Sequence, residues 1–225
     1  MILITYFGLL LGISFCLLLL TYKKSGNSHR LLGLYLLFLS LATAEPLYQE
    51  WLKVNVDPIV PDLIGGLYFL VGPLLLFYSS ALLGSQISRW IFHTFVFLCY
   101  VLAVVADRVL GQVHFSEIFD FALYEFLFLH VFFYLVWSFK VLNRAKNPFL
   151  DKDKMVTKMA LSWGKALIVL SLVLFGATFL IVHISLFVKL PFEGGVHPMQ
   201  IVLLIVILFI GLLNTETSRV KQVLR

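Results

Sequence analysis

SWGKALIVLSLVLFGATFLIVHISLF, residues 162–187, is the stretch that decides the fold. Beyond Lys165 it contains no Asp, Glu, Lys or Arg, and it exceeds the roughly 20 residues that a helix needs to cross the hydrocarbon layer of a membrane. The sequence therefore predicts a transmembrane helix here. Six further stretches are similarly apolar, and we expect seven spans near residues 2–22, 31–50, 62–84, 88–108, 117–140, 162–187 and 197–214.

The charged residues between these spans separate by sign. Of the 17 Lys and Arg residues, 14 fall on the side of the membrane that holds the C-terminal tail, and 9 of the 12 Asp and Glu residues fall on the other side. Because Lys and Arg near span ends resist translocation, the basic side is predicted to be cytoplasmic. The expected fold class is an all-α, polytopic seven-helix bundle of the cytoplasmic (inner) membrane, with an outside N-terminus, a cytoplasmic C-terminus and no soluble domain within residues 1–225.

Composition excludes several classes of protein. With 61% hydrophobic and 13% charged residues, the chain does not have the make-up of a soluble domain. Its basic residues are predicted to lie at helix ends facing anionic lipid, so we expect no direct binding of nucleic acid. A rhodopsin is excluded because the span 197–214 contains no lysine for a retinal Schiff base. Cys16 and Cys99 lie in apolar spans and are interpreted as small buried hydrophobes.

Two glycine motifs predict close helix packing or bending. Gly8 and Gly12 form a small-xxx-small pair in the first span, which favours packing within the bundle or, alternatively, a homodimer through that span. Gly72-Pro73 in the third span, together with the earlier Gly65-Gly66, is predicted to loosen or bend that helix.

Ionisable residues inside a bilayer are costly and tend to line cavities or pathways. The fifth span carries a polar stripe on its outer half, and its deepest member, Glu125, is the one that solvation in the headgroup layer explains least well. Glu125 is either a protonated packing residue or part of a pocket that opens outward. His93 and His130 are interpreted as packing histidines. The predicted pocket is lined by Glu45, Asp120, Tyr124, Glu125 and His183.

No histidine spacing of the HExxH kind occurs, so we expect no metal and no cofactor. The cytoplasmic segment 141–160 is large enough to contact a protein partner, together with the C-terminal tail. Its basic residues either contact that partner or only set topology and bind anionic lipid. The predicted partner contacts are Lys152, Lys154 and Lys158.

The order of features resembles the N-terminal membrane domain of bacterial membrane-bound regulators that carry a cytoplasmic AraC-type helix-turn-helix. The residues that carry this resemblance are Gly8 to Gly12 before Lys23-Lys24, Asn27 to Leu34, Gly72 to Tyr78, Trp163 and Gly211. The chain departs from that pattern because Val96 stands where a proline often follows His93, and because the output domain would begin only after Arg225. The resemblance implies a sensor fold, but it does not indicate a ligand. If residues 1–225 are the whole gene product, we expect any signal to pass to a separate partner.

Two functions remain open from the sequence. The first is a receptor-like sensor that binds a small or lipid-derived ligand from the outer side and is not an enzyme. The second is a small transporter or channel with an outward-opening polar cavity around Glu125. An intramembrane enzyme and a purely structural role are further alternatives, although no protease motif supports the former.

Overall fold

The computed structural model describes residues 2–21, 27–43, 59–85, 90–110, 117–144 and 152–187, together with Ile205. All regular structure in these ranges is α-helical, and they contain no β-strand. The predicted all-α class is therefore confirmed for the described part of the chain.

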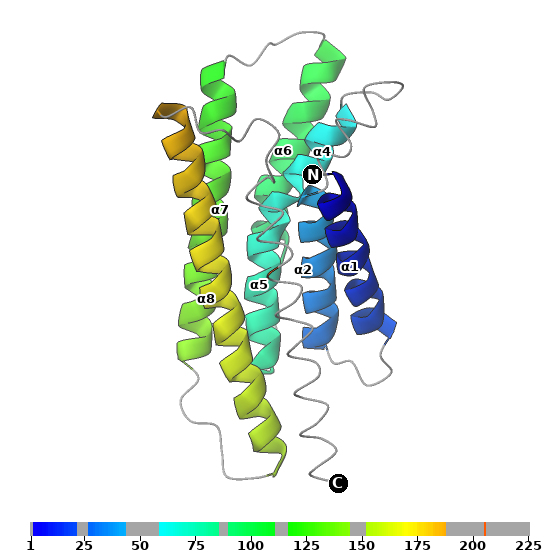
Figure 1. The fold of residues 1–225 in the computed structure, drawn as a ribbon, viewed down its shortest axis with the longest axis vertical. Coiled ribbons are helices and arrows are strands. Elements are labelled where there is room, and N and C mark those ends of the chain that lie inside the picture. Colours follow the sequence, from blue (N-terminus) through cyan, green and yellow to red (C-terminus); the bar gives the residue numbers. More distant parts are fainter. Residues whose placement is uncertain are drawn as a thin grey trace.

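The described ranges form the helices that Figure 1 shows as coiled ribbons. They are α1 (Ile2–Thr21), α2 (Asn27–Thr43), α4 (Ile59–Gly66), α5 (Tyr68–Leu82), α6 (Trp90–Leu110), α7 (Glu117–Asn143) and α8 (Lys152–Phe187). They cover most of the first six predicted spans. The predicted span 197–214 lies outside the described residues except for Ile205, so the count of seven spans stays a prediction.

Three helical stretches are long and apolar enough to cross a membrane, namely Leu63–Leu82, Glu125–Asn143 and Ala160–Ile181. Two shorter apolar helical stretches are Tyr6–Thr21 and Trp90–Ala106. Large apolar side chains are exposed on the outside of the bundle, among them Phe92, Phe95, Leu102, Leu129 and Val173. So many exposed large apolar side chains are unusual for a soluble monomer and ordinary where lipid is the solvent. These features indicate a membrane protein.

Several hydroxyl groups, by contrast, lie inside the bundle. Ser40, Ser79, Ser138 and Thr178 are all buried, and each donates a hydrogen bond to the carbonyl four residues earlier in its own helix. Because those carbonyls accept the extra bond, none of these four hydroxyls needs a partner on another helix. These four hydroxyls therefore add little to the choice of neighbouring helix.

The third predicted span is divided between α4 and α5. The break falls at Leu67, directly after Gly65-Gly66. The Leu67 N–H donates to the Ile64 carbonyl at 3.0 Å, and the Leu70 N–H donates to the Leu67 carbonyl at 3.0 Å. Both bonds span three residues instead of four, which tightens the chain into a turn between two helical segments.

α5 ends in a Schellman motif. The Ser85 N–H bonds to the Ser80 carbonyl, and the Gly84 N–H bonds to the Ala81 carbonyl. Gly84 has a φ of +68°, a conformation that residues with a Cβ adopt only at a cost. The glycine therefore decides where this helix stops.

The helices form a chain of neighbours. α1 packs on α2, α2 on α5, α5 on α7, and α7 on α8, while α6 contacts α4 and α5. Figure 1 shows α1 and α2 on one side of the bundle and α7 and α8 on the other, with α5 between them. α5 is accordingly the central element.

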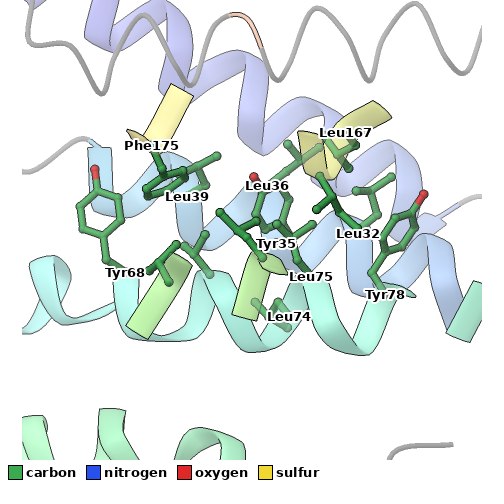
Figure 2. Packing of buried hydrophobic residues seen from close by; sticks show 14 of the residues in the cluster. Leu32, Tyr35, Leu36, Leu39, Tyr68, Leu74, Leu75, Tyr78, Leu167 and Phe175 are labelled. Atoms are coloured by element: carbon green, nitrogen blue, oxygen red, sulfur yellow. The ribbon is translucent and has the colours of Figure 1, made fainter. Parts of the chain in front are cut away.

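The core is formed by buried side chains of α2, α5, α7 and α8, together with Leu19 of α1. Figure 2 shows its labelled members, which are Leu32, Tyr35, Leu36 and Leu39 of α2, Tyr68, Leu74, Leu75 and Tyr78 of α5, and Leu167 and Phe175 of α8. Tyr35 is fully buried, and its hydroxyl lies 3.5 Å from the Ser171 Oγ, at the outer limit of a hydrogen bond.

The glycines predicted to pack helices lie inside the bundle. Gly8 and Gly12 are buried on α1, which packs against α2. At Gly72 an added Cβ would lie 2.8 Å from the Cβ of Tyr134, closer than real side-chain carbons approach. Gly72 therefore permits the close contact between α5 and α7.

The prediction for the two cysteines is wrong in one case. Cys16 is buried, whereas Cys99 is exposed on α6. In a bilayer the lipid-facing side of a helix is as apolar as its packed side, so an apolar span does not by itself reveal which of its residues are buried.

Candidate functional site

Glu125 of α7 and His183 of α8 meet across the interface between the two helices. Their Oε1 and Nε2 atoms are 2.6 Å apart, and the side chains are 25% and 28% exposed, respectively. Oε1 itself is enclosed and accepts no hydrogen bond of regular geometry within the described part of the chain. The His183 imidazole is therefore the polar group that compensates this carboxyl oxygen.

The ring of His183 is held by its own helix. Nδ1 lies 2.8 Å from the Phe179 carbonyl oxygen, one turn earlier. Because a carbonyl only accepts, Nδ1 carries the hydrogen and donates it. The Phe179 ring packs on the imidazole with centroids 4.0 Å apart, and it also contacts Phe128 of α7 at 5.4 Å. These contacts direct Nε2 towards Glu125.

Glu125 and His183 can be ionised at a modest cost in free energy only when both are ionised together. A lone carboxylate or imidazolium in an apolar environment is strongly disfavoured, whereas a paired one is compensated. The same two side chains can also exist as a carboxylic acid and a neutral imidazole. In both forms the pair has no net charge.

The other predicted pocket residues are placed only in part. Asp120 and Tyr124 belong to α7, but their side chains lie outside what the structure describes, and Glu45 lies outside the described residues altogether. The structure thus brings Glu125 and His183 together. Whether all five residues line one pocket stays a prediction.

A second polar contact joins α5 to α7, and sequence reasoning missed it. His130 Nε2 lies 3.2 Å from the Phe69 carbonyl oxygen and donates to it. In an α-helix this carbonyl accepts from the N–H four residues later, but that residue is Pro73, which has no N–H. His130 of the neighbouring helix α7 therefore supplies the hydrogen-bond donor that Pro73 lacks.

A sequence signal for this contact exists. Every proline inside a helix leaves the carbonyl four residues earlier without its donor, and in lipid such a carbonyl must be satisfied from elsewhere. The Gly72-Pro73 motif predicts only a loosened or bent helix when it is considered alone. In the structure Gly72 admits Tyr134 of α7, and Pro73 frees the Phe69 carbonyl for His130.

Aromatic rings surround this contact. Tyr134 lies 4.9 Å from His130 and stacks on Trp137 at 6.1 Å between ring centroids. Its hydroxyl is 2.9 Å from Nδ1 of His93 on α6. His93 and His130 both form hydrogen bonds inside the bundle, as packing histidines do.

The three lysines predicted to contact a cytoplasmic partner belong to the N-terminal part of α8. Lys152, Lys154 and Lys158 lie in the first two turns of α8, although their side chains are outside what the structure describes. Among the described residues, no group of three or more His, Cys, Asp or Glu side chains lies together as a metal site would require.

Comparisons with protein-family models, with characterised proteins and with solved structures return no match to this chain. The resemblance to the membrane domain of AraC-type regulators accordingly stays a prediction.

Proposed function

We propose that this protein is a receptor-like sensor of the cytoplasmic membrane, with seven spans, an outside N-terminus and a cytoplasmic C-terminus, which signals to a separate cytoplasmic protein. The separation of charges along the sequence supports the orientation. The apolar exterior of the described helices supports a position within the bilayer.

The observation that carries the sensor function is the contact that the Glu125–His183 pair makes between α7 and α8. Helix α8 runs without interruption over 36 residues, which corresponds to about 54 Å at 1.5 Å per residue. A hydrocarbon layer is only about 30 Å thick. His183 lies near one end of α8, and Lys152, Lys154 and Lys158 lie at the other. A change in the pair can therefore move the cytoplasmic end of the same rigid helix.

Site-specific photocrosslinking tests this proposal. A photoreactive amino acid in place of Lys158 is irradiated in native membranes, in the wild-type background and in Glu125→Gln and His183→Gln. We expect an adduct with a cytoplasmic protein whose yield changes about fivefold or more in both variants, the lower range of typical allosteric coupling. Ser138→Ala, a buried α7 change whose hydroxyl bonds within its own helix, is the control and should leave the yield unchanged.

Adducts with lipid alone, or equal yields in all four proteins, would refute the sensor function. They would instead favour the interpretation that the basic residues of α8 only set topology and bind anionic lipid.

Transport is the second candidate, favoured by an ionisable pair that is about one quarter exposed within otherwise apolar helices. It predicts that the purified protein in liposomes carries a proton or solute flux that Glu125→Gln abolishes. A signalling protein shows no such flux.

A further inference from the structure

We propose that one face of α7, next to α6, binds an anionic phospholipid of the cytoplasmic leaflet. The phosphate binds at the C-terminal end of α7, and an acyl chain lies along aromatic rings farther into the membrane. The leaflet rests on the orientation given under the proposed function, whereas the site itself does not. We call this surface the α6–α7 face, and its members are Phe126, His130, Phe133, Trp137, Lys140 and Arg144.

The six members of the α6–α7 face fall on one side of α7. At 100° per residue, their positions lie within an arc of about 80°. The Arg144 N–H donates to the Lys140 carbonyl at 3.1 Å, so the last turn of α7 extends to Arg144. The face begins with aromatic rings and ends with two cations. This order of groups matches a phospholipid, which has apolar chains and an anionic phosphate.

The rings of this face form a continuous ladder. Ring centroids are 6.2 Å apart for Phe126 and His130, and 5.5 Å apart for Phe133 and Trp137. Tyr134 joins the two pairs, at 4.9 Å from His130 and 5.6 Å from Phe133. Phe126, Phe133 and Trp137 are 48%, 59% and 39% exposed. From Phe126 to Trp137 the helix rises about 16 Å, close to half of the hydrocarbon layer and therefore to the length of one acyl chain.

The backbone of α6 stands apart from this face. Among the described residues, no Cα of α6 lies within 8 Å of a Cα of α7, although both helices pack on α5. His93 of α6 contacts α7 through its ring, which lies 5.6 Å from that of Trp137. Tyr100, farther along α6, packs instead on Phe69 of α5, with centroids 5.4 Å apart. The described contacts between α6 and α7 are therefore side-chain contacts near Trp137, and the rings of α7 beyond that level stay exposed.

Three hydrogen-bond donors lie at the phosphate end of the face. The buried Tyr134 hydroxyl is 2.9 Å from Nδ1 of His93 and donates its hydrogen there, since a buried hydroxyl needs an acceptor. Nε2 of the neutral ring then carries a hydrogen, which it donates to no protein group within the described ranges. Lys140 and Arg144 are exposed, about 4.5 and 10.5 Å beyond Trp137 along the helix axis. One N–H group and two cations are thus available to a phosphate.

The two cations decide which lipid this face fits. Lys and Arg both bind phosphate oxygens, and Arg does so in a bidentate manner. A zwitterionic headgroup brings a cation that Lys140 and Arg144 repel, whereas a headgroup with net negative charge does not. Trp90 of α6, 61% exposed, begins that helix three residues before His93, and tryptophan is typical of the headgroup level. In the proposed orientation this end is cytoplasmic, where anionic lipid attracts basic side chains.

Native mass spectrometry of the purified full-length protein tests the site, with phosphatidylglycerol and phosphatidylcholine of identical acyl chains as probes. The wild-type protein should bind its first phosphatidylglycerol about tenfold more tightly, or better, than phosphatidylcholine. Lys140→Gln and Arg144→Gln should each weaken phosphatidylglycerol binding by about fivefold, the contribution of one basic residue beside anionic lipid. Lys140→Arg keeps the charge and should bind like wild type. Lys165→Gln, which removes a described lysine from α8, is the matched control and should also bind like wild type.

Photocrosslinking in liposomes of both lipids, mixed in a known ratio, tests where the lipid binds. A photoreactive amino acid in place of Phe133 should capture phosphatidylglycerol in excess of its share of the membrane. In place of Val173, which is 62% exposed on α8, it should capture the two lipids in their bulk ratio. The excess at residue 133 should vanish when Lys140→Gln and Arg144→Gln are combined.

Several results would overturn the site. They are equal affinities for the two lipids, phosphatidylglycerol binding that neither Lys140→Gln nor Arg144→Gln weakens, and bulk lipid ratios at residue 133. Displacement of the lipid by excess glycerol 3-phosphate would also overturn it, because the headgroup alone would then be the ligand. None of these measurements involves a cytoplasmic protein, so failure of the crosslink from residue 158 would reject the sensor function and leave the lipid site standing.

Discussion

The hydrogen bond from His130 to the Phe69 carbonyl leads to a quantitative prediction for the unfolding free energies of His130 and Pro73 variants. Replacing His130 by Phe keeps an aromatic ring beside Phe69, Phe126 and Tyr134, but it removes the N–H donor. The Phe69 carbonyl then has neither a helical donor nor an interhelical one. A buried carbonyl left unsatisfied costs about 1–3 kcal/mol, so the free energy of unfolding should fall by that amount.

Pro73→Ala should rescue this loss. Alanine at position 73 provides the N–H that closes the missing helical bond to the Phe69 carbonyl. In that background His130→Phe should cost much less, because the carbonyl retains a donor. Interhelical hydrogen bonds in membrane proteins contribute about 0.6 kcal/mol on average and up to about 1.7. We expect a coupling energy within or slightly above this range.

Reversible unfolding of the four proteins in mixed detergent micelles gives the double-mutant cycle. The aromatic contacts are altered equally in both backgrounds, so they cancel in the coupling energy. His93→Phe is the control, since the bond of this histidine is with the Tyr134 hydroxyl instead of a carbonyl. If His130→Phe costs the same in the wild-type and the Pro73→Ala backgrounds, the assignment of the proline's function is refuted.

Three further outcomes can be measured by the same unfolding assay. Gly72→Ala should destabilise by about 1–3 kcal/mol through its clash with α7, whereas Gly176→Ala, with nothing within 4 Å of the added carbon, should be neutral or stabilising by up to about 1 kcal/mol. Gly84→Ala should cost about 1–2 kcal/mol, because φ is +68° there. Glu125→Leu should cost about 1–3 kcal/mol by leaving His183 without its acid, and adding His183→Leu should recover most of that loss. A Glu125→Leu cost unchanged by the second substitution would show that the two side chains are not coupled.

The length and polarity of the apolar runs are sufficient to predict helices, because a run of about 20 apolar residues has few other structures in lipid. The same signal does not reveal the break at Leu67. Gly65-Gly66 indicate a loosened helix, but they do not show that the Leu67 and Leu70 N–H groups bond to carbonyls three residues earlier.

The faces of the helices are harder to predict than their existence. In a soluble protein the buried face is the apolar one, whereas α7 is apolar on both its packed and its lipid-facing sides. Phe128 of α7 is buried and Leu129 is 62% exposed, although both side chains are large and apolar. Their positions along the spans suggest that Glu125 and His183 lie at similar depths. Their contact depends on helix rotation, which apolar patterning does not encode.

The two polar contacts of α7 differ in a way that bears on the proposed function. His130 bonds to a backbone carbonyl of α5, an acceptor that neither titrates nor moves independently of its helix. Glu125 pairs with His183 of α8 through two side chains, whose Oε1 and Nε2 atoms are 2.6 Å apart and which can each change rotamer. Under the proposed function, the α5–α7 contact is therefore the fixed part of the bundle. The α7–α8 contact is the part that a signal can open, and α8 is the helix that carries the change towards Lys158.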